Sequence, residues 1–282
     1  MTRPSLSDYG TYDESAVPRL WDGVVGAWCP SLGPTGSRLH DFSRSNNWGT
    51  LTNMDPATDW VVSGGQYALD FDGTNDYVTI PSVYTYASGV WLSASVWFRR
   101  NVTGATHEIL NKFSGTSAAN EDGWLLRITN TDKLNVTIAS SGNYNNWQST
   151  ATYADTAWHH VAFTLRFGSG GTFGLWYDGA PVATTLTGTG NVIPDSDATN
   201  YAMLIGVQRY AGASYNLLNG QVSDAVVWQS ALSADTAREL YLLGRGGMFQ
   251  RRRVRRAYVS EAAAVRSYLF VNRGQVIGGG TL

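Results

Sequence analysis

The sequence ALDFDGTNDYVTI at residues 68–80 decides the fold of this chain. Leu69 and Phe71 alternate with two aspartates, which is the period of a β-strand that buries one face. Residues 72–75, Asp-Gly-Thr-Asn, predict a tight turn, because Gly adopts positive φ freely and Asp and Asn side chains accept hydrogen bonds from their own backbone. The strand pattern resumes at Tyr77. The stretch therefore predicts two short strands around a tight turn.

Short alternating runs of the same kind continue along the chain in both directions. Turn residues separate them, and no helical period intervenes until residue 233. Strand after strand without helices predicts an all-β, antiparallel sandwich. The runs lie at 24–28, 92–98, 108–112, 124–129, 133–139, 158–167, 172–177, 201–207 and 221–229.

One short C-terminal helix is predicted after Ser233, whose hydroxyl suits an N-cap. Ala237, Leu240 and Tyr241 fall on one face of this helix. Gly244 ends it, because Gly is favoured where a helix stops.

The composition limits the classes of protein to consider. The 282 residues contain 43% hydrophobic and 15% charged residues, enough to bury a core and too few charges for a disordered chain. Cys29 is the single cysteine, so no intrachain disulfide can form. No apolar run is long enough for a membrane span, and the first nine residues lack the apolar core of a signal peptide. We therefore expect no membrane insertion and no export.

The order of these motifs resembles the laminin G-like, concanavalin A-like jelly rolls, including the branch compared with pentraxins. The resemblance covers residues 21–243 and implies one antiparallel jelly-roll sandwich. The pieces that carry it are VGAW (25–28), DFS to GTL (41–51), ALDFDG and DYV (68–78), SASVWF (93–98), ILNK (109–112), WHHVA (158–162), WYDG (176–179), LIG (204–206), NGQVSDAVVW (219–228) and ALS (231–233).

The chain is also similar to proteins encoded by tailed bacteriophages and prophages. The matching parts are YDES at 12–15, LGPTG at 32–36 and the Arg-rich segment that follows the jelly roll. This resemblance implies a virion protein with extended arms at both ends. The implied boundaries are an N-terminal arm at 1–20, the jelly roll at 21–243, and a C-terminal anchor with short strands at 244–282.

Members of the laminin G-like family often hold one Ca²⁺ on loop oxygens. Calcium takes about six to eight oxygen ligands, some of them carboxylate. The resemblance implies one candidate set at Asp41, Asn46 and Asp224, and a second set at Asp72 and Asn75. The alternative is that these side chains only close turns.

Two predicted loops, 141–148 and 208–216, combine aromatic rings with amide side chains. Rings that stack on sugar faces and amides that bond sugar hydroxyls are what the resemblance to lectins implies. The same residue types are enriched at protein–protein contacts, so both uses stay open. The candidate residues are Tyr144, Asn145, Trp147, Arg209, Tyr210 and Tyr215.

Catalysis is not expected from this sequence. Glycosidases need two carboxylates that flank the scissile bond, which jelly-roll glucanases place on one strand as Glu-x-Asp-x-Glu. His159 and His160 are adjacent, so strand alternation places them on opposite faces and they cannot bind one ion together. We predict no catalytic residue. The glutamates, none of which lies in such a pattern, are Glu14, Glu108, Glu121, Glu239 and Glu261.

The C-terminal segment differs from the rest of the chain in charge. Residues 244–282 contain eight Arg and one Glu, whereas residues 1–243 carry a net charge of −9. An Arg run could bind nucleic acid, but the lack of Lys and the apolar pieces at 268–277 favour docking on an acidic protein surface. The predicted anchor residues are Arg251, Arg252, Arg253, Arg255 and Arg256.

Together these features predict a non-enzymatic structural protein of a tailed-phage virion, as capsid decoration or as a tail or fibre component. Assembly is expected in the host cytoplasm, in an oligomeric contact with other virion proteins. The jelly roll is expected to face outward and to bind glycans. The alternative is a bacterial carbohydrate-binding adhesion module without a virion role.

Overall fold

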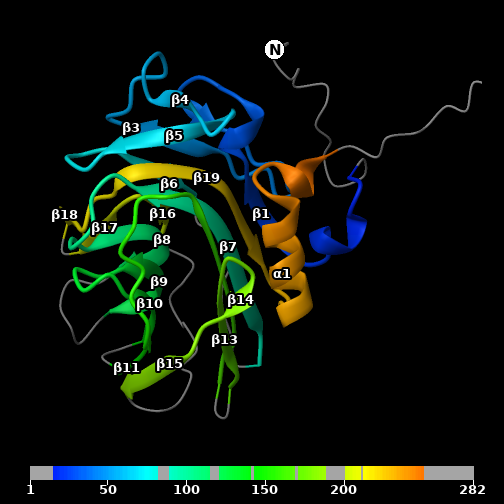
Figure 1. Ribbon diagram of the computed structural model, residues 1–282, viewed down its shortest axis with the longest axis vertical. Helices are drawn as coiled ribbons and strands as arrows, with labels where there is room; N and C mark the ends of the chain where they lie inside the picture. Colours follow the sequence, from blue (N-terminus) through cyan, green and yellow to red (C-terminus); the bar gives the residue numbers. More distant parts are fainter. Residues whose placement is uncertain are drawn as a thin grey trace, which may run out of the picture. The chain divides into compact units, whose positions relative to one another are not determined.

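The computed structural model describes residues 15–81, 89–114, 121–140, 143–168, 171–188, 201–210 and 212–250. These residues form two antiparallel sheets packed face to face, with a thin helical layer outside one of them (Figure 1). The prediction of an all-β antiparallel sandwich with one short C-terminal helix is confirmed. No helix in the described ranges is long and apolar enough to cross a membrane.

The first sheet has eight strands within the described residues. Their order is β14-β13-β12-β7-β19-β5-β4, with β1 beside β19. The strands are β1 (Val24–Trp28), β4 (Trp60–Ser63), β5 (Gln66–Asp72), β7 (Trp91–Arg100), β12 (His159–Arg166), β13 (Phe173–Tyr177), β14 (Ala180–Pro181) and β19 (Asn219–Trp228).

The second sheet has nine strands in the same part of the chain, in the order β15-β11-β10-β9-β8-β16-β6-β3-β2. A separate hairpin joins β17 (Gln208–Tyr210) to β18 (Ala213–Tyr215). The strands of the second sheet are β2 (Arg38–Leu39), β3 (Gly49–Thr52), β6 (Tyr77–Ile80), β8 (His107–Ser114), β9 (Asp122–Ile128), β10 (Leu134–Ser140), β11 (Asn143–Ser149), β15 (Thr184–Gly188) and β16 (Met203–Ile205).

The turn between β5 and β6 carries the chain from the first sheet to the second. Asp72 Oδ1 accepts hydrogen bonds from the backbone N–H groups of Thr74 (2.7 Å) and Asn75 (3.2 Å). Asp76 Oδ2 accepts one from the N–H of Asp72 at 3.0 Å. These bonds fix a turn that crosses the sandwich, so β5 and β6 line the same core from opposite sheets.

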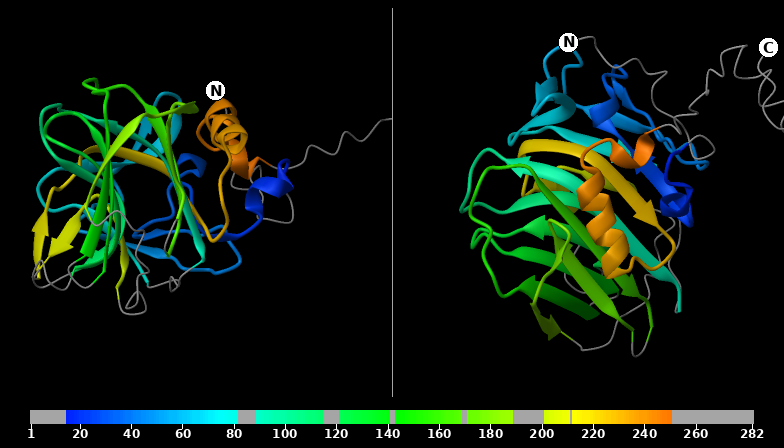
Figure 2. Two further views of the ribbon diagram at one scale, coloured as in Figure 1. Left: turned by 90° about the horizontal axis from the view of Figure 1, so that it is seen from below. Right: turned by 45° about the vertical axis from the view of Figure 1, so that its right-hand side comes forward.

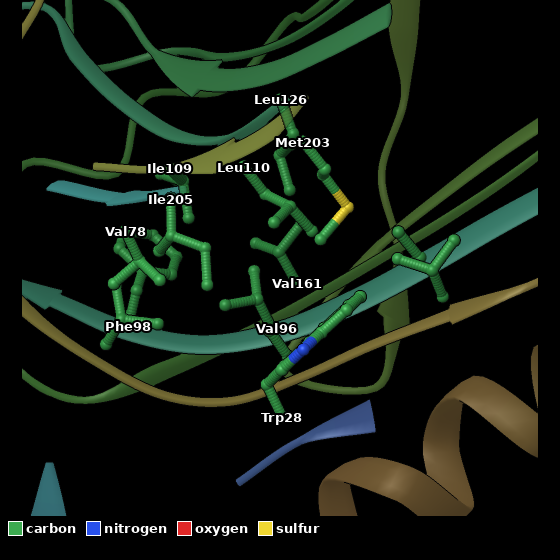
Figure 3. Close-up of a cluster of buried hydrophobic side chains, with 14 of the residues drawn as sticks. Trp28, Val78, Val96, Phe98, Ile109, Leu110, Leu126, Val161, Met203 and Ile205 are labelled. Atoms are coloured by element: carbon green, nitrogen blue, oxygen red, sulfur yellow. The ribbon is translucent and has the colours of Figure 1, made fainter. Parts of the chain in front are cut away.

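The main core fills the space between the sheets (Figure 3). Val96 and Phe98 of β7 point from the first sheet toward Leu110 and Ile205 of the second. All four side chains are almost completely buried. Each such side chain contributes about 1.5–3 kcal/mol through removal of apolar surface from water, so this layer is the main source of stability.

A helical layer covers the outer face of the first sheet, as both views of Figure 2 show. Ser233 Oγ accepts a hydrogen bond from Thr236 N at 3.1 Å, and Gly244 ends the helix, as predicted. Ala237 and Leu240 are buried against the sheet. The layer consists of η3 (Pro18–Trp21), η4 (Pro30–Leu32), α1 (Ala234–Leu243) and η6 (Gly247–Phe249).

The first and last described residues meet in this helical layer. Ala16 N donates to Gln250 O at 2.8 Å, and Ser15 Oγ donates to Met248 O at 3.1 Å. Trp21 is buried there, with its ring edge-on to Phe249 at 5.4 Å. The folded body therefore extends beyond both predicted boundaries, 21 and 243.

Gly206 illustrates how tightly the core is packed beside the β5–β6 turn. Its φ is +86°, and a Cβ atom added there would lie 2.7 Å from the ring of Phe71. Gly65 has a similar φ of +82°, but an added Cβ would meet no atom within 4 Å. The two glycines share the backbone constraint and differ in the space around them.

We expect Gly206→Ala to lower the free energy of unfolding by about 3 kcal/mol or more, because it adds a steric conflict to the cost of a left-handed backbone. Gly65→Ala is the matched control and should lower it by about 1–2 kcal/mol. Urea denaturation of both variants measures the difference. Equal losses would contradict the packing of Gly206 against Phe71.

Candidate functional site

The second sheet has one face toward the main core and one away from it. We call the latter the polar face; the first sheet lies between it and α1 (Figure 1). Strand register places two rows of mostly polar side chains across β8 to β11. One row is Glu108, Arg127, Asn135 and Gln148, and the next is Asn111, Leu125, Thr137 and Asn146.

A β-bulge in β8 makes both rows possible. The register shifts by one residue between Glu108 and Leu110, so Leu110 pairs with Leu126 and faces the core. Without the bulge, Glu108 and Leu110 would share a face, because strand side chains alternate. The bulge therefore places Glu108 and Asn111 on the polar face although they are three positions apart.

Hydrogen bonds fix the side chains of the two rows. Arg127 Nε donates to Asn135 Oδ1 at 2.9 Å, and Thr137 Oγ1 donates to the same oxygen at 3.2 Å. Asn135 Nδ2 donates to Asn146 Oδ1 and to Trp147 O. The amides and hydroxyls of this face are thus held in place by one another, which is the preorganisation that a binding surface needs.

The carboxyl group of Glu108 forms no salt bridge with another described residue. The residue is fully buried, and neither carboxyl oxygen has a hydrogen-bond partner among the described residues. Burial raises the pKa of Glu108 to about 8, although the charge of Arg127 and the amide of Asn111 lower it. The Oδ1 atom of Asn111 also lacks a partner among the described residues, so a neutral Glu108 has an acceptor beside it.

A cavity of about 330 Å³ opens beside the β17–β18 hairpin. The two strands of this hairpin are labelled at the left of Figure 1. Its lining includes Glu121, which precedes β9, and three residues of the hairpin region. Glu108 N donates to Asn216 O at 2.8 Å, which joins the hairpin to β8. The three hairpin residues are Gln208, Tyr215 and Asn216.

Arg209 lies on the other side of β17 from this cavity. Register pairs Gln208 with Tyr215 and Arg209 with Ser214, so the Arg side chain leaves the opposite face of the hairpin. Its guanidinium donates to Tyr77 Oη at 3.2 Å and lies 5.9 Å from the centre of that ring. Arg209 therefore ties the hairpin to β6.

The predicted glycan-binding residues divide into separate groups. Tyr144 is 46% exposed on β11, whereas Asn145 and Trp147 of the same strand are buried. The Trp147 ring stacks on Phe173 at 4.3 Å in the main core, so it cannot stack on a sugar. Tyr215 is 47% exposed at the cavity, whereas Arg209 leaves the opposite face of the hairpin and Tyr210 ends β17.

Both predicted loops in this region are strands. Residues 141–148 include most of β11, in which Asn145 and Trp147 alternate with exposed or half-buried Tyr144 and Asn146. The many amide side chains of this segment are typical of a loop, but the alternation of buried and exposed positions indicates a strand. Residues 208–210 and 213–215 are the two strands of the β17–β18 hairpin. Gln208 and Asn216 lie in the predicted 208–216 segment but were not among the candidate residues. No signal in the sequence indicated Glu121, which only the fold brings to the cavity.

The carboxylates of the first predicted calcium set are engaged by other groups. Asp41 accepts hydrogen bonds from the N–H groups of Ala27, Ser43 and Asn47 and from Ser43 Oγ, each at 2.8 or 2.9 Å. Asp224 is engaged in the same way by four donors: Cys29 Sγ, Ser31 Oγ, Ser223 Oγ and Gly246 N. Neither residue offers a free carboxylate to an ion.

The remaining calcium candidates lie apart on the surface. Asn46 is exposed, and its Oδ1 accepts a hydrogen bond from Trp48. Asp72 closes its own turn, and the carbonyl oxygen of Asn75 accepts from Asn53 Nδ2 at 2.9 Å. Within the described residues, no group of three or more His, Cys, Asp or Glu side chains could hold a metal ion. Neither set of side chains forms a donor set that fits a calcium ion. Calcium binding therefore stays a prediction.

The predicted anchor lies outside the described residues. Arg251, Arg252, Arg253, Arg255 and Arg256 follow Gln250 directly in the sequence. The apolar pieces at 268–277 and most of the predicted N-terminal arm are also outside them.

Given these contacts, we expect EGTA and added CaCl₂ to leave the melting temperature of the full chain unchanged. An ion present at 100 times its Kd would stabilise the native state by about 2.7 kcal/mol, which thermal unfolding detects readily. A rise in melting temperature with calcium would restore the predicted site. Asp72→Asn and Asp41→Asn would then show which set holds the ion.

The buried carboxyl of Glu108 predicts a pH-dependent stability. In the folded protein the pKa of Glu108 is about 8, above the ordinary value of 4.5. The neutral Glu108 carboxyl therefore contributes fully to the stability of the fold below about pH 4.5, and this contribution is lost as the pH rises through 8. We expect Glu108→Gln to abolish this loss and to raise the free energy of unfolding at pH 9 by roughly 5 kcal/mol relative to the natural chain. Urea denaturation at pH 5 and pH 9 tests this.

Glu239→Gln is the control for that experiment. Glu239 pairs at 2.5 Å with Arg19, whose side chain is 71% exposed. Removal of such a surface pair should change stability by less than about 1 kcal/mol at either pH. An unchanged pH profile in Glu108→Gln would contradict the assignment to Glu108.

Solved structures share this fold at low sequence identity. The binding domain of botulinum neurotoxin serotype D/C has a TM-score of 0.55 and 14% identity, over 79% of this chain and 52% of that one. Domain 4 of AbnA, an extracellular arabinanase from Geobacillus stearothermophilus solved with arabinotriose, has a TM-score of 0.54 and 13% identity, over 81% and 99%. A Trypanosoma rangeli sialidase has 0.53 and 14%, over 78% and 32%. The chain thus spans about half of the toxin domain and a third of the sialidase.

A family model matches residues 72–238. The matched segment runs from the end of β5 into α1 and includes the polar face and the β17–β18 hairpin. No curated protein sequence matches the chain significantly. The model is that of the laminin G-like domains of the concanavalin A-like lectin/glucanases superfamily, and the chain belongs to this superfamily.

Proposed function

We propose that this chain is a non-enzymatic, glycan-binding jelly roll displayed on the virion of a tailed phage. The cavity at the polar face carries the binding part of the proposal. It combines an exposed aromatic ring, Tyr215, with the amides of Gln208 and Asn216. These groups suit a sugar, because a ring can cover the apolar face of a pyranose while amides bond its hydroxyls.

The carboxyl groups near the cavity support binding without turnover. Glycoside hydrolysis needs two carboxyl groups that both reach the scissile bond. Glu121 lines the cavity, whereas Glu108 is fully buried and cannot touch a bound sugar. Among the described residues, the polar face therefore presents one accessible carboxylate, not a flanking pair.

The position of Ser15 and Gln250 is compatible with attachment to a particle. Ser15 and Gln250, where the described residues begin and end, lie together in the helical layer. The polar face is on the other side of the sandwich. A partner bound through the segments outside these residues would leave the polar face accessible. An Arg-rich segment suits an acidic protein surface, since the Arg guanidinium pairs bidentately with carboxylates.

The virion role also rests on the sequence similarity to phage-encoded proteins at 12–15, at 32–36 and in the Arg-rich segment. On this proposal the partners are capsid or tail proteins, the chain is oligomeric in the particle, and assembly occurs in the host cytoplasm.

The test is whether the chain is present in purified particles. In a phage that encodes it, we expect the natural chain to co-purify with virions, and replacement of Arg251, Arg252, Arg253, Arg255 and Arg256 by Gln to reduce its occupancy at least tenfold. Quantitative mass spectrometry and cryo-electron microscopy measure the occupancy. Replacement of the exposed Arg44 and Arg238 is the control and should have no effect. Absence of the natural chain from particles would refute the virion role.

A further inference from the structure

We propose that the cavity beside the β17–β18 hairpin binds an uncharged sugar residue and rejects sugars that carry a carboxylate; this inference rests on the glycan-binding function proposed above. The cavity volume of about 330 Å³ is near the lower end for ligand pockets, about 300–1,000 Å³, and suits a short saccharide. Its described lining is Glu121, Gln208, Tyr215 and Asn216.

The charge of the cavity argues against acidic sugars. Glu121 is the charged member of the described lining. Burial raises the pKa of Glu121, although the charge of Arg127 opposes this. An acidic sugar would bring a second negative charge beside Glu121, and like charges at short distance repel. Like-charge contact of this kind is a means of excluding the wrong ligand.

The neighbouring arginines make their described hydrogen bonds outside the cavity. Arg209 leaves the opposite side of β17, where its guanidinium donates to Tyr77 Oη and to Gly212 O. Arg127 donates through Nε to Asn135 Oδ1, and its charge acts on both Glu108 and Glu121. No described residue therefore directs an Arg fork, the usual partner of a carboxylate, into the cavity.

The uncharged groups of the cavity match a neutral sugar. Asn216 Nδ2 donates to Gln208 Oε1 at 2.8 Å. This bond orients both amides and uses one donor and one acceptor, so Gln208 Nε2 and Asn216 Oδ1 are held ready for adjacent hydroxyls. Register places Gln208 opposite Tyr215, so an amide and an aromatic ring lie on the same face of the hairpin.

The experiment is a calorimetric titration of the full chain with two sets of sugars. The neutral set is lactose, maltotriose and arabinotriose, and the acidic set is sialyllactose and trigalacturonate. We expect binding of at least one neutral sugar and of neither acidic one. Gln208→Ala and Tyr215→Ala should each weaken that binding by at least tenfold, while circular dichroism shows an unchanged fold.

Two further variants give the test its controls. Tyr144→Ala removes a tyrosine that is exposed to the same extent, 46% against 47% for Tyr215, but lies on β11; it should leave the affinity unchanged. Glu121→Gln keeps the size of the side chain and removes its charge. It should allow sialyllactose to bind, because the carboxylate that repels it is gone.

The results distinguish a failure of this inference from a failure of the proposed glycan-binding function. Three results would show that the inference is wrong while glycan binding stands. The natural chain could bind only acidic sugars, or Tyr144→Ala could abolish binding while Tyr215→Ala does not. The third such result is that Glu121→Gln gains no acidic ligand. If no sugar of either set binds, the proposed glycan-binding function fails, and this inference fails with it.

Discussion

The buried carboxylate of Asp224 is the constraint on which the arrangement of layers depends. It accepts hydrogen bonds from Cys29 and Ser31 after β1, from Ser223 within β19, and from Gly246 after α1. A buried carboxylate without such donors would be strongly destabilising. Burial, followed by the Asp224 charge, raises the pKa of Cys29, so its thiol stays protonated and can donate. The first sheet and the helical layer must therefore pack together to satisfy one charge.

This packing makes the two outer faces of the sandwich different. β19 is buried on both sides, because the helical layer covers the face that points away from the main core. Trp228 Nε1 donates to Leu20 O at 2.7 Å, which holds the N-terminal segment on the same layer. The second sheet has no corresponding helix among the described residues. One side thus gathers both ends of the folded body, and the other retains polar rows and a cavity.

The polar face contains hydrogen-bonded polar side chains and also buried polar atoms without a hydrogen-bond partner among the described residues. Asn135 connects Arg127, Thr137 and Asn146 in one network, so these side chains support one another. The Oδ1 atom of Asn111 and the carboxyl of Glu108 are exceptions, since both are buried without a hydrogen-bond partner among the described residues. An unpaired buried carboxyl of this kind favours the neutral acid and makes the face sensitive to pH. The pH sensitivity of this face therefore depends on the bulge in β8, which places Glu108 and Asn111 there.

Local patterns in the sequence were enough for the elements that have a local cause. Alternation at 68–80 and the cap at Ser233 predict strands and a helix that the structure contains, because strand period and capping act over a few residues. The same reasoning failed at β11, where amide-rich composition concealed the alternation that turns Trp147 into the core.

The sequence by itself therefore determined the antiparallel sandwich, its superfamily, the terminal helix and the charge difference between body and C-terminal segment. Only the tertiary structure decided that the turn after Asp72 crosses between sheets, that Asp41 and Asp224 are saturated by hydrogen bonds, and that Glu121 shares a cavity with Tyr215. The physical reason is that strand register and sheet pairing join residues far apart in the chain, and a local pattern carries no information about such partners.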